Sequence, residues 1–284
     1  MRVDDLSGPR IRKEAVQDAL EDLAWLGLDW DGEPVFQSQR LDRYAPAMRT
    51  LAHAGHVYPC DLTRREIARA SSAPHAADSR ATKGAGRETR FPRALRPAHT
   101  PRVFTKQDES TNWRFITPAG SVEFEDPFAG SRTVHPADTI GDFVVWTKIG
   151  EPAYQLATVV DDHEMGVTEV VRGDDLLDSA GRQLLLFRAL GLTPEPTFWL
   201  LPLVVGEDGR RLAKRHGDTR LAHYREAGVE PQRVVALLAR WSGFAGAPDA
   251  MTASDFAAAF EPATMARSRT VFTAEDDAWL RAGC

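Results

Sequence analysis

The 284-residue sequence has few cysteines, no long apolar run and no excess of positive charge. Its two cysteines, Cys60 and Cys284, are too few and too far apart for a disulfide framework, which fits a reducing compartment. No apolar stretch approaches the length of a membrane span, and no signal peptide follows Met1, so we expect a cytoplasmic protein without a membrane partner. The formal net charge of −6 gives no overall attraction to nucleic acid, so RNA contacts would depend on local basic patches.

Several common catalytic signatures are also missing. The sequence has no Walker loop, no GxGxxG after a strand, no GxSxG and no HExxH, which argues against the enzyme classes that use these motifs. The length is enough for one large or two modest domains, and 43% apolar with 27% charged residues is an ordinary globular composition.

The strongest functional pattern is the basic segment 209–217, which follows the apolar run 198–205 after a Glu207-Asp208-Gly209 turn. Its two flanking glycines enclose the cationic side chains Arg210, Arg211, Lys214, Arg215 and His216. A loop of this kind suits the phosphates of a nucleotide, because it is dense in phosphate-binding groups. A solvated surface loop is the alternative interpretation.

Hydrophobic periodicity predicts helices over residues 16–26, 38–54, 178–190, 231–241, 256–260 and 273–279. We expect Ser38 to cap the second helix, with Pro46 kinking or delaying it, and Asp178 or Ser179 to cap the third.

Short apolar runs predict strands at residues 57–58, 113–116, 122–125, 142–146, 167–171 and 198–205, while the segment 154–160 suits a helix or a strand. A Pro118-Ala119-Gly120 turn predicts that 113–116 and 122–125 form a hairpin. The order of strand, helix and strand between 167 and 205 predicts a parallel βαβ unit. Ligands bind at the carboxyl ends of parallel strands, so Arg172 and the loop after Val205 should face one crevice.

Residues 71–111 show no apolar periodicity, which predicts an insertion outside the core. The stretch from Arg80 to Lys106 contains many basic residues and a single acid, Glu88. This composition suits either binding to RNA phosphates or a solvated loop.

Two polar clusters have competing interpretations. Arg172 ends an apolar strand, where its guanidinium could bind a carboxylate in bidentate fashion or form a salt bridge to Asp174 or Asp175. The run Asp161-Asp162-His163 could be metal ligands, but adjacent side chains do not easily converge on one ion, so we favour a hydrogen-bonding role.

A series of motifs resembles the catalytic domain of the glutamyl-tRNA synthetase family, in the same order along the chain. They are Trp25-Leu26-Gly27-Leu28-Asp29-Trp30, Gln37-Ser38-Gln39-Arg40-Leu41-Asp42-Arg43-Tyr44, Tyr58-Pro59-Cys60, Ala153-Tyr154-Gln155-Leu156-Ala157, Val159-Val160-Asp161-Asp162, Val170-Val171-Arg172-Gly173-Asp174-Asp175-Leu176-Leu177-Asp178-Ser179 and Arg211-Leu212-Ala213-Lys214-Arg215. The resemblance runs from residue 1 to about residue 245.

The resemblance implies an α/β fold, the Rossmann-type parallel sheet of class I aminoacyl-tRNA synthetases with an inserted acceptor-binding subdomain and a short helical C-terminal tail. Residues 1–58 would be the first part of the catalytic domain, 59–140 the inserted subdomain, 141–217 the second part with the KMSKS-like loop, and 218–284 the helical segment. The implied activity is the activation of L-glutamate with ATP and Mg²⁺, by an enzyme that we expect to be a monomer.

The family's site residues carry over by position. Asp4 stands where the family has a glutamate that contacts the substrate ammonium, and Tyr154 and Arg172 match its glutamate-binding tyrosine and arginine. The KMSKS-like loop would bind ATP through Arg211, Leu212, Ala213, Lys214 and Arg215. Lys214 matches the catalytic lysine, which stabilises charge on the α-phosphate.

Two departures from the family pattern stand out. The family's zinc ligands are three cysteines and a tyrosine, but here Cys60, Leu62, Phe91 and Leu95 fall at these positions, so we expect no metal. The family's first strand, HIGH-type turn and following helix should precede Arg2 and are missing. We therefore expect either that the start of the protein is placed too late or that the chain is a shortened relative. In this form it should activate glutamate very poorly or not at all.

The resemblance leaves three functions to compare. The short tail after His216 favours transfer of glutamate to the queuosine base of tRNA(Asp), because it is too short for the helical anticodon-binding domains of a glutamyl-tRNA synthetase. The alternatives are a fragment of such a synthetase and a non-catalytic remnant that binds tRNA or a partner.

Overall fold

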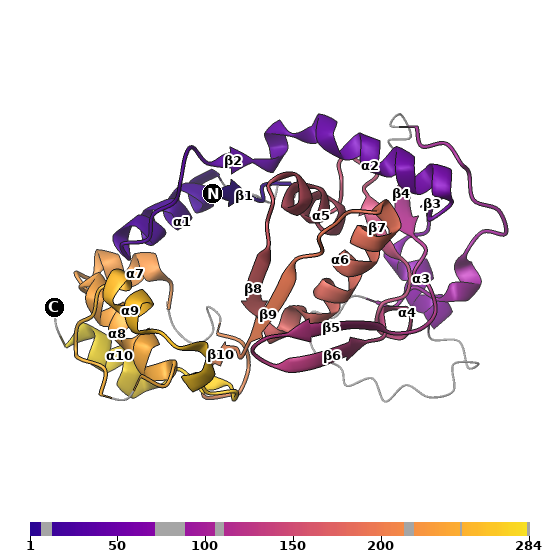
Figure 1. Ribbon diagram of the computed structural model, residues 1–284. Coiled ribbons are helices and arrows are strands. Elements are labelled where there is room, and N and C mark those ends of the chain that lie inside the picture. The colour runs from indigo at the N-terminus through magenta and orange to yellow at the C-terminus, as the bar shows by residue number, and fades with distance from the viewer. Residues whose placement is uncertain (7–12, 72–88, 106–110, 213–218, 245, 283–284) are drawn as a thin grey trace.

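A computed structural model describes residues 1–6, 13–71, 89–105, 111–212, 219–244 and 246–282 (Figure 1). Its N-terminal elements are β1 (Arg2–Val3), α1 (Lys13–Trp25), β2 (Val35–Phe36), the 3₁₀-helix η2 (Gln37–Gln39), α2 (Leu41–Ala54), β3 (Val57–Cys60) and α3 (Arg64–Ser71). Strand β1 pairs in parallel with β2. The predicted first and second helices and the strand at residues 57–58 are confirmed.

The predicted start of the second helix is wrong. Ser38 lies in η2, where its backbone N–H and its hydroxyl donate to the carboxylate of Asp5 at 2.8 and 2.5 Å, so the hydroxyl does not cap a helix. Helix α2 begins at Leu41 without a side-chain cap and continues through Pro46, so the proline does not delay it. The helix ends as expected at Ala54, and the following Gly55 caps it with a φ of 77°, a left-handed conformation that favours glycine.

An antiparallel sheet follows, in the order β3, β4 (Asn112–Phe115) and β7 (Phe143–Trp146). The predicted hairpin between residues 113–116 and 122–125 is wrong, because β4 pairs with β3 and β7 instead. Strand β5 (Val122–Asp126) forms a hairpin with β6 (Gly130–Val134), closed by the Asp126 carboxylate, which accepts from the backbone N–H groups of Phe128 and Ala129. The short elements η3 (Arg93–Leu95) and α4 (Pro136–Thr139) flank these strands.

The predicted βαβ unit is confirmed. Strand β8 (Glu169–Gly173) leads through η4 (Asp174–Leu176) and α6 (Leu177–Leu190) to β9 (Thr197–Leu201), which pairs with β8 in parallel. The ambiguous segment at 154–160 is a helix, α5 (Tyr154–Glu164), which packs against α6. Helix α6 ends at Leu190 as predicted, followed by Gly191 as its cap, but Asp178 and Ser179 lie within its first turn and do not cap it.

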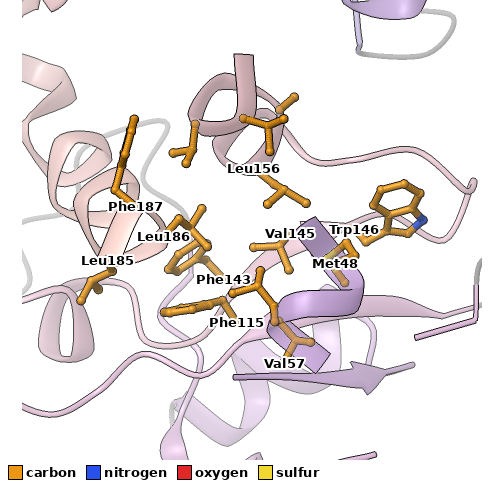
Figure 2. Packing of buried hydrophobic residues seen from close by; sticks show 14 of the residues in the cluster. Met48, Val57, Phe115, Phe143, Val145, Trp146, Leu156, Leu185, Leu186 and Phe187 are labelled. Carbon is orange, nitrogen blue, oxygen red and sulfur yellow. The ribbon is translucent and has the colours of Figure 1, made fainter. Parts of the chain in front are cut away.

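The main core lies between helices α2, α5 and α6 and the strands beside them (Figure 2). Figure 2 shows Phe115, Phe143 and Val145 from the antiparallel sheet beside Leu156 of α5 and Leu186 of α6. The prediction that 71–111 lies outside the core is wrong for part of its described residues. Phe104 is buried edge-on against both Trp113 and Trp146, an arrangement that stabilises aromatic pairs.

The C-terminal segment packs against the first helix (Figure 1). Its elements are α7 (Leu221–Glu226), α8 (Pro231–Trp241), α9 (Ala253–Ala259), η6 (Pro262–Thr264), β11 (Thr270–Val271) and α10 (Ala274–Arg281). Trp25 of α1 packs into the same cluster as the buried Tyr224, and Arg225 forms an ion pair with Asp22 at 2.9 Å. The three predicted C-terminal helices are confirmed. Among the described helices, none has both the length and the apolar character required to cross a membrane.

Candidate active site

Arg172 lies in β8, and its side chain is held on two sides. Its Nη2 donates to Oε1 of Gln183 at 2.7 Å, and its guanidinium lies 4.9 Å from the centre of the Phe198 ring. Its Nη1 is buried and has no hydrogen-bond partner within the described part of the chain. Burial lowers the pKa of the guanidinium, because it disfavours the charged form.

The alternative role for Arg172, a structural salt bridge, is wrong. No ion pair joins Arg172 to Asp174 or Asp175 in the described structure. Asp175 instead accepts from Nη1 of Arg211 at 3.0 Å. A partly buried guanidinium whose Nη1 has no partner among the described residues can bind an incoming carboxylate, and that group would also satisfy the unpaired donor.

Tyr154 is the first residue of α5, where the bond from the backbone N–H of Ala153 to the carbonyl of Val145 fixes the start of the helix on β7. The Tyr154 side chain is 46% exposed, so it is accessible to a ligand. Tyr154 and Asp162 lie close enough to Arg172 for a charge on either side chain to act on its guanidinium. The structure therefore places Tyr154 near Arg172, while the glutamate-binding role of both residues stays a prediction.

Asp4 follows β1 and reaches the same neighbourhood through Arg2. The Arg2 guanidinium donates to Asp4 at 2.7 Å and to the buried Asp162. Burial raises the pKa of the Asp162 carboxyl, while the hydrogen bond from Arg2 and the charges of Arg2 and Arg172 act in the opposite direction. Two of the predicted glutamate-binding residues, Asp4 and Arg172, are thus linked electrostatically to one buried group, Asp162.

The neighbouring Asp161 has the hydrogen-bonding role that the sequence favours. Its buried carboxylate accepts from Gln37, Arg40 and Tyr44, each at 2.9 Å. These donors come from η2 and the start of α2, so Asp161 fixes α5 against the N-terminal part of the chain.

The basic loop is described only at its beginning. Strand β10 (Val204–Val205) leads to a turn in which the backbone N–H of Gly206 donates to the carbonyl of Arg210, and β11 pairs with β10 in parallel. The predicted residues Ala213, Lys214 and Arg215 lie outside the described residues. Arg211 and Leu212 lie within them, and the Arg211–Asp175 ion pair brings the loop beside the end of β8, as expected for one crevice.

The residues at the family's zinc positions do form one cluster. Cys60 and Phe91 are buried, and Leu62 and Leu95 pack against them together with Tyr58. Only Cys60 of the four offers a zinc ligand, so this cluster does not fit a tetrahedral zinc site.

We predict that purified protein contains less than about 0.1 zinc per chain, because zinc sites use three or four ligands. Elemental analysis after dialysis without chelator measures this, and Cys60→Ala should leave the zinc content unchanged. A stoichiometry near one zinc that falls in the Cys60→Ala variant would contradict the prediction.

The sequence reasoning missed Gln183 and Phe198 as neighbours of Arg172. Gln183 is only 1% exposed, on the face of α6 that also buries Ala180 and Phe187. A glutamine within a buried helical stripe is a usable signal, because buried polar groups require hydrogen-bond partners.

Three comparisons bear on this site. Residues 1–278 match the family described as tRNA synthetases class I (E and Q), catalytic domain. A glutamyl-Q tRNA(Asp) synthetase of Rhodopirellula baltica is 44% identical over 255 residues, which cover 88% of this chain and 76% of that protein. A protein of the same name from Symbiobacterium thermophilum is 40% identical over 291 residues, covering 100% of this chain and 88% of its own length.

Solved structures show the same fold. The glutamate-tRNA synthetase from Elizabethkingia anophelis aligns with a TM-score of 0.77 at 23% identity over 98% of this chain. A glutamate tRNA ligase from Elizabethkingia meningosepticum, in complex with its amino acid, aligns with a TM-score of 0.76 at 23% identity. The chain spans 62% and 61% of the lengths of these two proteins.

Proposed function

Because the chain belongs to the family of class I tRNA synthetase catalytic domains for glutamate and glutamine, we propose that it activates L-glutamate with ATP and transfers the glutamyl group to tRNA. The observation that carries the choice of glutamate is Arg172, a partly buried cation near Tyr154 whose Nη1 is buried and unpaired among the described residues. A guanidinium in this position favours a side-chain carboxylate over a neutral side chain.

In the proposed reaction, Arg172 binds the side-chain carboxylate, Tyr154 borders it, and Asp4 receives the ammonium group. The α-carboxylate oxygen attacks the α-phosphorus of ATP, and the bond to the pyrophosphate oxygen breaks, which gives glutamyl adenylate and pyrophosphate. Lys214 stabilises the charge on the α-phosphate, and Mg²⁺ accompanies the ATP. A hydroxyl of the tRNA then attacks the glutamyl carbonyl, with AMP as the leaving group.

We further propose that the acceptor is the queuosine base of tRNA(Asp) and that the enzyme acts as a monomer in the cytoplasm. The names and lengths of the relatives at 38–44% identity support this acceptor. Relatives named glutamate–tRNA ligase are 33% and 34% identical, and the chain covers 57% of each. Charging of a tRNA 3′ end is therefore the second candidate.

Activation can be tested separately from transfer. We expect ATP–pyrophosphate exchange that depends on L-glutamate and is at least about tenfold slower with L-glutamine or L-aspartate, because each lacks a correctly placed charged carboxylate. An equal rate with all three amino acids, or none with glutamate, would contradict the proposed activation step.

A further inference from the structure

Gln183 is the one polar side chain that holds the Arg172 guanidinium in the described structure. We propose that Gln183 is a positioning residue that determines specificity: its neutral amide orients Arg172 while leaving the positive charge of Arg172 available for the side-chain carboxylate of the substrate. This inference rests on the proposed function and extends it to the choice between an acidic and a neutral amino acid.

The hydrogen bond fixes the orientation of the Gln183 amide. Arg172 can only donate, so the amide must present Oε1 to it, at 2.7 Å, and must direct Nε2 elsewhere. This Nε2 is buried and has no partner within the described residues, as is true of Nη1 of Arg172. Two unpaired donors on neighbouring groups are a suitable arrangement for a ligand with two acceptor oxygens, such as a carboxylate.

Two of the nearby acids, Asp162 and Asp175, are bound to other cations. Asp162 accepts a hydrogen bond from Arg2, and Asp175 forms its ion pair with Arg211. Asp162 still favours the charged form of Arg172 through space, but it forms no ion pair with it in the described structure. The group in direct contact with the guanidinium is therefore a neutral amide, which orients Arg172 without neutralising it.

The packing around Gln183 makes this orientation rigid. Gln183 is 1% exposed on α6, and the ring of Phe198 on β9 lies against the guanidinium. A glutamate at position 183 would occupy nearly the same volume and would place a carboxylate where the amide oxygen now lies. That carboxylate would compete with the substrate for the same guanidinium.

We expect Gln183→Glu to weaken the binding of L-glutamate by roughly 30-fold and that of L-glutamine by less than about threefold, since only the charged ligand loses its counter-charge. Gln183→Met keeps the length of the side chain and removes the hydrogen bond without adding charge. It should weaken glutamate binding by only about three- to fivefold and keep the preference for glutamate over glutamine.

The test is calorimetric titration of the full chain with L-glutamate and with L-glutamine, accompanied by thermal unfolding and by the KM values for glutamate and ATP in pyrophosphate exchange. Gln17→Glu is the matched control, because it makes the same chemical change at an exposed site on α1 and should leave all values unchanged. Gln183→Glu should raise the KM for glutamate and leave the KM for ATP and the melting temperature close to wild type.

Equal losses for glutamate and glutamine in Gln183→Glu, or a glutamate affinity within threefold of wild type, would overturn the inference and leave the proposed function intact. The inference would also be overturned if Gln183→Met lost the preference for glutamate as completely as Gln183→Glu. Altered packing alone would then explain both variants. If the wild-type protein bound no glutamate and supported no exchange, the proposed function would fail, and the inference with it.

Discussion

Replacing Arg172 by alanine should reduce glutamate-dependent ATP–pyrophosphate exchange by at least about a hundredfold, because a charge-assisted bond to a buried group contributes about 2–5 kcal/mol to binding. The loss should appear mainly as a higher KM for glutamate, with the KM for ATP little changed. Arg172→Lys keeps the positive charge but lacks the two-pronged guanidinium, so we expect an intermediate loss.

Arg188→Ala is the control for this substitution. Arg188 lies on α6 and forms a half-exposed ion pair with Glu195 at 2.8 Å, so its removal tests the loss of an arginine from the same region without touching the site. Exchange by Arg188→Ala should equal that of the wild type. If Arg172→Ala retained a normal KM for glutamate, Arg172 would not be the carboxylate-binding residue.

Replacing Asp142 by alanine should lower the free energy of unfolding by about 3–5 kcal/mol, because it leaves a partly buried arginine and other buried donors without their partner. The Asp142 carboxylate is fully buried and accepts from Arg96 at 2.6 and 2.7 Å, from Tyr58 at 2.8 Å and from the backbone N–H of Thr117 at 2.9 Å. The hydrogen bond from Arg96 to Asp142 raises the pKa of that guanidinium, and burial together with the charge of Asp142 raises the pKa of the Tyr58 hydroxyl.

Urea unfolding measures this effect. Asp142→Asn keeps the shape of the side chain and should cost less than alanine. Asp138→Ala, which removes a carboxylate that is 77% exposed and lies 3.8 Å from Arg90, should change stability by less than about 0.5 kcal/mol. If Asp142→Ala and Asp138→Ala lowered the free energy of unfolding equally, the hydrogen bonds to Asp142 would not be a main source of stability.

Local sequence patterns predict the helices well and the pairing of strands less well. Helix α8 has Pro231 at its start and a continuous apolar stripe, so its local signals and its packing agree. The turn at Pro118-Ala119-Gly120 has equally clear local signals but does not close a hairpin. Strand β4 finds its partners in β3 and β7, which lie far away in the sequence, and local patterns carry no information on such contacts.

The candidate site shows the same contrast between local patterns and contacts that form only in the fold. Arg172, Tyr154 and Asp4 could be chosen as candidates because each stands at a recognisable position in a family motif, and their roles stay predictions. For Gln183 the sequence shows a buried polar residue in a helical stripe but not its partner, because the return of α6 beside β8 brings it within 2.7 Å of Arg172. The two caps assigned to Ser38 and Asp178 are wrong for a related reason: a polar residue near a helix start can bond elsewhere, as Ser38 does with Asp5.

The most direct test of the proposed function is the transfer of labelled glutamate to purified tRNA(Asp), prepared once with queuosine and once with guanosine at the same position. We predict that the protein, with ATP and Mg²⁺, labels the queuosine form to near stoichiometry, that it leaves the guanosine form unlabelled, and that the label survives removal of the tRNA 3′ end. Equal labelling of both forms, or label lost with the 3′ end, would contradict the account and would favour ordinary charging of tRNA with glutamate.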